Sequence, residues 1–171
     1  LILNFIESTP LLKDGLEPYP ISLRGINWVK FLSKFEVKNE VIDGHLNKQF
    51  KLLENQLEYH LLGNHLLENA FSLLFGAVYF NDVARFNKAK KLLIQELNEQ
   101  TLSDGGHFEL SPMYHQIILD RLLDCYQLVS ANERSFLTED FKAFLREKAN
   151  LMVGWLRAVT FSNGDIPFFN D

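Results

Sequence analysis

The sequence predicts an all-α protein built from antiparallel helical hairpins. Three observations support this fold class. Apolar residues recur every three or four positions in each long apolar segment. No segment of useful length alternates between apolar and polar residues, as a half-buried strand would. Glycine, proline and asparagine stand between the periodic segments, where they end or cap helices. With 171 residues, 47% of them hydrophobic, the chain is long enough for one domain with its own core.

The predicted elements follow one another with short connections. Residues 1–18 hold Pro10, Gly15 and Pro18 without a sustained period, so we expect an irregular lead-in there. We expect residues 19–171 to form one helical domain. The amphipathic segment 83–98 is expected to carry Arg85 on its polar face. No internal repeat is visible, so a two-layer helical array is favoured over a regular solenoid. Helices are predicted at residues 21–35, 39–60, 65–80, 83–98, 113–129 and 138–160.

The segment 65–80 is apolar almost all round, which is typical of a helix buried on most sides. Gly63 and Asn64 precede it. Glycine is unfavourable inside a helix and asparagine is a favoured N-cap, so we expect a new helix to begin at His65 with Asn64 as its cap. This helix is expected to belong to an inner layer.

The longest interruption between periodic segments is residues 103–115, with the sequence Ser-Asp-Gly-Gly-His-Phe-Glu-Leu-Ser-Pro-Met-Tyr-His. Asp104-Gly105-Gly106 predicts a turn, because glycine adopts positive φ without steric conflict. Ser111 and Pro112 predict an N-cap and a first helical residue. Tyr114 and His115 then fall in the first turn of the next helix. A loop that presents a phenol and an imidazole at a helix start indicates a candidate site.

Composition excludes several classes of partner. The formal net charge is −5 and the lysines and arginines are spread along the chain, which argues against nucleic acid. The single cysteine, Cys125, excludes an internal disulfide and leaves the compartment open, periplasmic or cytoplasmic. No apolar run reaches the ~20 residues of a membrane span. The five histidines lack zinc-ligand spacing, so neither a metal nor another cofactor is predicted. The start at Leu1 and the apolar segment 166–169 near the end suggest a piece of a longer protein.

Plainer interpretations of the candidate residues remain open at this point. Tyr114 could be a half-buried core aromatic, His115 a surface residue, and Asn64 only a cap. A glycoside hydrolase would need two carboxylates across the scissile bond. Glu68, Asp104 and Glu109 are candidates for that role, and their spacing selects no pair.

Three runs of sequence, residues 19–28, 57–70 and 104–115, resemble the helical domain of the heparinase II/III-like family, and residues 164–171 resemble the end of that domain. The resemblance implies an incomplete α/α toroid, which in the family is followed by a β-sandwich domain. Members are polysaccharide lyases that cleave uronic-acid polymers by β-elimination. The sandwich has no counterpart in this sequence, so we expect a fragment that could be inactive alone, and a missing C-terminal sandwich as its partner.

The resemblance also implies roles for individual residues. Asn64 would hydrogen-bond the uronate carboxylate, which makes the C5 proton easier to remove, and Tyr114 would act as acid and base. His65 and His115 are the candidates for a partner base or an orienting group. Further contacts with substrate are expected from three residues, of which Glu68 could also fix the tautomer of His65: Glu68, His107 and Glu109.

We expect the pairs Asn64–His65 and Tyr114–His115 to converge on one concave surface, because both stand at predicted helix N-termini. The expected partner is an acidic polysaccharide or a surface glycan of bacteria. The acidic balance of the chain favours a glycan that is poor in sulfate. Two alternatives to a lyase stay open: a hydrolase on an α/α barrel, and a carbohydrate-binding helical module without catalytic activity.

Overall fold

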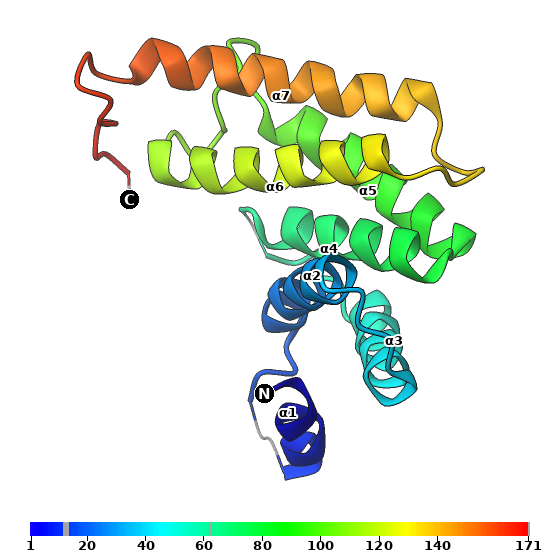
Figure 1. Ribbon diagram of the computed structural model, residues 1–171. Coiled ribbons are helices and arrows are strands. Elements are labelled where there is room, and N and C mark those ends of the chain that lie inside the picture. Colours follow the sequence, from blue (N-terminus) through cyan, green and yellow to red (C-terminus); the bar gives the residue numbers. More distant parts are fainter. Residues whose placement is uncertain (12–13, 62, 171) are drawn as a thin grey trace. The chain divides into compact units, whose positions relative to one another are not determined.

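The computed structural model describes residues 1–11, 14–61 and 63–170, and its regular structure in these ranges consists of helices joined by loops (Figure 1). Across the described residues, β pairing is confined to one isolated bridge between Thr101 and His107. The predicted all-α class is therefore confirmed. The helices in chain order are α1 (Ile2–Ser8), the short 3-10 helix η1 (Thr9–Leu11), α2 (Pro18–Lys34), α3 (Glu40–Asn55), α4 (His65–Phe80), α5 (Val83–Gln100), α6 (Pro112–Ala131) and α7 (Glu139–Val159).

Most of the predicted helix boundaries agree with the structure to within two or three residues, and α4 has the predicted limits. Helix α2 begins three residues earlier than predicted, at Pro18. Pro18 and Pro20 fit its first turn because the N–H groups there have no partner within the helix. Helix α3 ends at Asn55, five residues before the predicted limit. Its N-cap is Asn39, whose side chain accepts hydrogen bonds from two backbone N–H groups of the first turn.

The prediction of an irregular lead-in is wrong for residues 2–11, which form α1 and η1. Three apolar residues of α1, Ile2, Phe5 and Ile6, follow helical spacing, and tertiary packing stabilises this short helix. The ring of Phe5 lies edge-on to Trp28, with centroids 5.6 Å apart, and 6.1 Å from the ring of His45. A helix too short to be stable alone forms when packing of this kind stabilises it.

The chain forms two compact units, residues 1–88 and 89–171, and α5 begins in the first and ends in the second. In the first unit, α2, α3 and α4 enclose the fully buried Phe50. A Cβ added to Gly25 of α2 would lie 2.9 Å from the Phe50 ring, and one added to Gly76 of α4 would lie 3.0 Å from it. The first distance is shorter than packed carbon atoms allow and the second is tighter than most real Cβ contacts, so glycine at these positions makes room for the ring.

Arg85 does not lie on an exposed polar face, as the amphipathic pattern suggested, because it is only 2% exposed. Its guanidinium group donates hydrogen bonds to Glu54 and Asn47 of α3, and it also lies over the ring of Phe50. A buried charge needs partners of this kind, since desolvation would otherwise exclude it. The pairing of Arg85 on α5 with residues of α3 thus explains why its side chain is buried rather than exposed.

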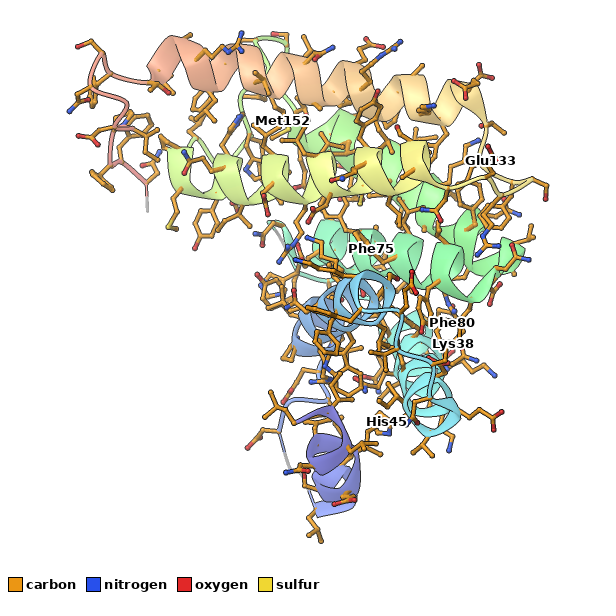
Figure 2. All side chains as sticks on the ribbon, viewed as in Figure 1. Lys38, His45, Phe75, Phe80, Glu133 and Met152 are labelled. Atoms are coloured by element: carbon orange, nitrogen blue, oxygen red, sulfur yellow. The ribbon has the colours of Figure 1, made fainter. Side chains whose placement is uncertain are left out.

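In the second unit, α6 and α7 lie side by side (Figure 1). Figure 2 shows the side chains packed between these two helices, among them Met152 of α7, which is fully buried. The loop 101–111 connects α5 to α6 and reaches α7. None of the described helices combines the length and the hydropathy that a bilayer-crossing helix requires.

Candidate functional site

The loop 101–111 is built by close contact between its two glycines and helix α7. Gly105 has φ +91°, and a Cβ there would overlap the backbone carbonyl oxygen of Leu151 and lie 2.7 Å from its carbonyl carbon. The N–H of Gly106 donates to Oδ1 of Asp104 at 2.9 Å. A Cβ at Gly106 would lie 2.8 Å from Nε1 of Trp155. The predicted turn is confirmed, and it needs glycine for space as well as for backbone conformation.

The end of this loop sets the position of Tyr114. Ser111 is the N-cap of α6, and its Oγ accepts a hydrogen bond from the backbone N–H of Tyr114 at 3.2 Å. Pro112 occupies the first helical position, as predicted. Two residues before it, Leu110 has φ +54°, which is unfavourable for a residue with a bulky side chain. The Tyr114 side chain is half-buried.

His115 is part of the core of the second unit. Its ring is fully buried, with the centroid 4.5 Å from that of Trp155. Nε2 lies 3.0 Å from the carbonyl oxygen of Met152, which can only accept, so Nε2 carries the proton. Burial lowers the pKa of His115, and the bond to Met152 and the charge of Asp104 oppose this effect. The plainer interpretation of His115 as a surface residue is therefore wrong.

His107 is also buried, at 1% exposed, and it joins the loop to α5. Nε2 of Gln100 donates to Glu96, so the amide oxygen of Gln100 faces Nε2 of His107, 3.1 Å away. Burial, with a smaller effect from His115, lowers the pKa of His107 to about 4. His107 is therefore neutral at pH 7, and the 3.7 Å approach of its Nδ1 to Glu109 is not an ion pair. The ring holds the loop rather than facing solvent.

In the first unit, Asn64 and His65 stand at the start of α4. Asn64 occupies the N-cap position with φ −83° and ψ −1°, and its side chain makes no capping hydrogen bond. The expected capping bond is thus wrong, although the helix begins where predicted. Asn64 is 8% exposed. The side chain of His65 is 39% exposed, and its ring centroid lies 4.8 Å from that of Tyr19.

The carboxylate beside His65 is Glu58, which the sequence did not single out. Oε1 of Glu58 lies 3.3 Å from Nδ1 of His65. Glu68, the residue expected to orient His65, lies one helical turn after it and is 1% exposed. Glu58 precedes His65 by seven residues and lies outside any helix, so helical spacing could not relate the two. The only signal in the sequence was its place in the run 57–70.

Each unit therefore holds part of the predicted site. Residues Asn64, His65 and Glu68 lie at the start of α4, while the loop and α6 carry Tyr114, Glu109 and the two buried histidines. That Asn64 and Tyr114 share one surface stays a prediction. Within the described ranges, no group of three or more His, Cys, Asp or Glu residues is placed to hold a metal ion. The chemical groups present suit proton transfer and the binding of an anionic substrate.

Comparison with solved structures shows the fold. The heparan sulfate lyase HepC of Pedobacter heparinus aligns with 90% of this chain and 25% of its own, with a TM-score of 0.68 and 24% identity. A mutant of the same enzyme aligns with 91% of this chain and 25% of its own, with a TM-score of 0.71 and 23% identity. The likeness confirms the predicted fold class, an all-helical array of the toroid type.

Sequence comparison gives relatives named heparin-sulfate lyase. The one from Pedobacter heparinus is 26% identical over 147 residues, which is 84% of this chain and 20% of the relative. The one from Bacteroides thetaiotaomicron is 30% identical over 121 residues, which is 66% of this chain and 17% of the relative. The chain spans about a fifth of the length of these curated relatives. The sequence profile described as Heparinase II/III N-terminus matches residues 21–171. The chain therefore belongs to the heparinase II/III N-terminus family.

Proposed function

We propose that the whole protein containing this chain is a polysaccharide lyase that cleaves a uronic-acid glycan by β-elimination. The observation that carries the proposal is the family match over residues 21–171, together with relatives named heparin-sulfate lyase. The side chains at the two helix starts support it, because an amide, an imidazole and a phenol are the groups that this reaction uses.

β-Elimination removes the proton on C5 of the uronate and expels the oxygen on C4. The electron pair of the C5–H bond forms the C4–C5 double bond, while the C4–O bond breaks. In the proposed mechanism, His65 accepts the C5 proton and Tyr114 donates its hydroxyl proton to the leaving oxygen. The proton on His65 then returns to Tyr114 through solvent, which restores both groups without net consumption of water.

The difficult part of this reaction is the negative charge that develops beside the uronate carboxylate. Asn64 is proposed to donate its amide N–H to that carboxylate, since an amide neutralises part of the charge without giving up a proton. Glu109 is proposed to contact a sugar hydroxyl group, whereas the burial of Glu68 argues against direct contact with the sugar.

The buried histidines are assigned supporting roles in this proposal. His115 donates to the carbonyl of Met152, and His107 is bound to Gln100, so each ring holds one end of the segment that carries Tyr114. Their burial argues against direct proton exchange with a substrate. His65 is therefore preferred over His115 as the base.

The proposed substrate class is a glycan containing uronic acid, and its degree of sulfation is a separate question. The net charge of −5 favours a glycan poor in sulfate, while the names of the relatives point to heparan-type chains. A substrate panel should therefore pair heparan sulfate with an unsulfated polymer of the same backbone. A higher turnover on the unsulfated polymer would support the first expectation.

The test uses the whole protein and measures the release of an unsaturated uronate by its ultraviolet absorbance. Tyr114→Phe should lower turnover by about 10²–10⁴-fold, the usual contribution of general acid–base catalysis. Tyr126→Phe is the matched control, since it removes a hydroxyl from the same helix and should leave turnover unchanged. Asn64→Ala should also lower turnover.

Two results would contradict the lyase. One is product without a double bond, which indicates hydrolysis. The other is near-normal turnover in Tyr114→Phe together with loss of activity in Glu109→Gln, because a hydrolase relies on carboxylates. Binding of the glycan without any product would instead favour a carbohydrate-binding module.

A further inference from the structure

A buried chain of hydrogen bonds connects helix α2 to His65. It consists of Ser22, Glu58 and Asn69, which are 0%, 6% and 0% exposed, and we call it the Glu58 clamp. Nδ2 of Asn69 donates to Oε2 of Glu58 at 3.0 Å and to Oγ of Ser22 at 3.1 Å. The backbone N–H of Glu58 donates to Oδ1 of Asn69 at 3.1 Å.

The clamp has only one arrangement of donors and acceptors. Because a backbone N–H can only donate, the atom of Asn69 that faces it must be the oxygen, which places the NH₂ group toward Ser22 and Glu58. Ser22 donates its own proton to the carbonyl oxygen of Pro18 at 2.8 Å, so its Oγ is an acceptor toward Asn69. Both N–H groups and the oxygen of the Asn69 side chain therefore make hydrogen bonds, and the amide group cannot flip without losing them.

This arrangement determines which oxygen atom of Glu58 faces His65. With Oε2 of Glu58 held by Asn69, Oε1 faces Nδ1 of His65 at 3.3 Å. A carboxylate accepts and does not donate, so Nδ1 must carry the proton. In a neutral imidazole the other nitrogen then has a bare lone pair. The ring of Tyr19, with its centroid 4.8 Å from that of His65, packs against the imidazole and limits its rotation.

We propose that Glu58 is a positioning residue that holds His65 as the Nδ1–H tautomer and thereby makes Nε2 the proton acceptor. The clamp also places a negative charge beside the imidazolium that forms after proton transfer, which stabilises it. The identity of the proton that Nε2 accepts, at C5 of a uronate, rests on the proposed function. The tautomer itself does not.

A purely structural role for Glu58 predicts something different. Glu58 could serve only to attach the segment between α3 and α4 to Asn69, in which case the tautomer of His65 would not depend on it. The substitution Glu58→Gln separates the two roles. A glutamine has one oxygen, and Asn69 requires it, so the NH₂ group of Gln would face Nδ1 of His65. Nδ1 would then have to accept, and the ring would change to the Nε2–H tautomer.

The tautomer can be read from the two nitrogen chemical shifts of the imidazole in long-range ¹H–¹⁵N spectra of the 171-residue chain. Spectra are recorded above about pH 8, where an ordinary imidazole is neutral. His65→Gln assigns the signal. We expect Nδ1–H in the wild type, Nε2–H in Glu58→Gln, and no change in Glu36→Gln, which removes an exposed carboxylate outside the clamp.

An Nε2–H wild type would overturn the proposal, and this measurement needs no variant beyond the one used for assignment. An unchanged tautomer in a folded Glu58→Gln chain would also overturn it. Circular dichroism verifies that the variant is folded.

Kinetics of the whole protein supply a second readout. Glu58→Gln should lower kcat by about 10²-fold or more with little change in KM. In the Nε2–H tautomer, Nε2 already carries a proton and cannot accept one from the substrate. If the tautomer changes as expected but the whole protein releases no unsaturated product, the proposed function fails and the clamp stands. If the protein is a lyase and Glu58→Gln keeps wild-type kcat, the clamp proposal fails and the function stands.

Discussion

The substitution Gly105→Ala should destabilise the second unit strongly, for two reasons that the structure separates. The backbone at Gly105 has φ +91°, a conformation that residues with a Cβ rarely adopt. Backbone strain of this kind costs about 1–3 kcal/mol. The new methyl group would also overlap the carbonyl group of Leu151, which belongs to the backbone of α7 and cannot move like a side chain. Overpacking adds about 1–3 kcal/mol.

The expected loss in the free energy of unfolding is therefore about 2–6 kcal/mol, a large part of the ~5–15 kcal/mol of a typical domain. For a chain of this length it corresponds to a fall in Tm of about 4–24 °C. Far-ultraviolet circular dichroism during thermal and urea unfolding measures both quantities. The loop should also loosen, so the pKa of the buried His107 should move back toward its ordinary value.

Gly154→Ala is the matched control within the same unit. Gly154 lies inside α7 with nothing within 4 Å of an added Cβ and without a positive φ. Alanine should therefore stabilise this helix, by about 0.5–1 kcal/mol. The two Gly→Ala changes should have opposite signs. A Gly105→Ala chain as stable as the wild type would refute the argument that the loop is held against the α7 backbone.

Two further predictions concern stability. The folded chain holds His107 with a pKa of about 4, against about 6.5 when unfolded, so between these pH values the unfolded state binds the proton and the folded state does not. The free energy of unfolding is therefore unaffected by the protonation of His107 above about pH 6.5. As the pH falls toward 4 it decreases, by about 3 kcal/mol at most. Burial of His115 changes it in the same direction. Urea unfolding at a series of pH values checks this, and a His107→Gln chain whose stability falls as steeply would contradict it. Asn39→Ala should cost about 1 kcal/mol because it removes the acceptor for two N–H groups of α3, whereas Thr138→Ala should change little because the Thr138 side chain makes no cap bond to α7. Equal thermal shifts in these two variants would show that capping is not the cause.

The features that sequence reasoning predicted are those set by neighbouring residues. Helix α4 has the predicted limits because thirteen of its sixteen residues are buried and a run of that kind has few alternatives. The turn at Gly105 and the cap at Ser111 were predicted because both depend on backbone conformation and on contacts within three residues. Local rules are sufficient for such elements.

The features that were missed depend on contacts between distant residues. Helix α1 is stabilised by the contact of Phe5 with Trp28. Arg85 can be buried because Glu54, on another helix, accepts its hydrogen bond. His115 is a core residue because of Met152, thirty-seven positions later in the chain. Likewise, Glu58 gains its role through Asn69, whose partner Ser22 lies forty-seven positions away. No periodicity along the chain encodes these partners.

The packing of Phe50 against Gly25 and Gly76 has a consequence for how this family can vary. The ring leaves no space for a side chain at either glycine, with added Cβ atoms at 2.9 and 3.0 Å. A residue larger than glycine at position 76 should therefore occur only with a smaller residue than phenylalanine at position 50. At position 25 a larger residue also requires Ser72 to move or change, because its Oγ would lie 2.9 Å from the added Cβ. The three positions, on three consecutive helices, should thus change together during evolution, and a set of homologous sequences should show this as covariation.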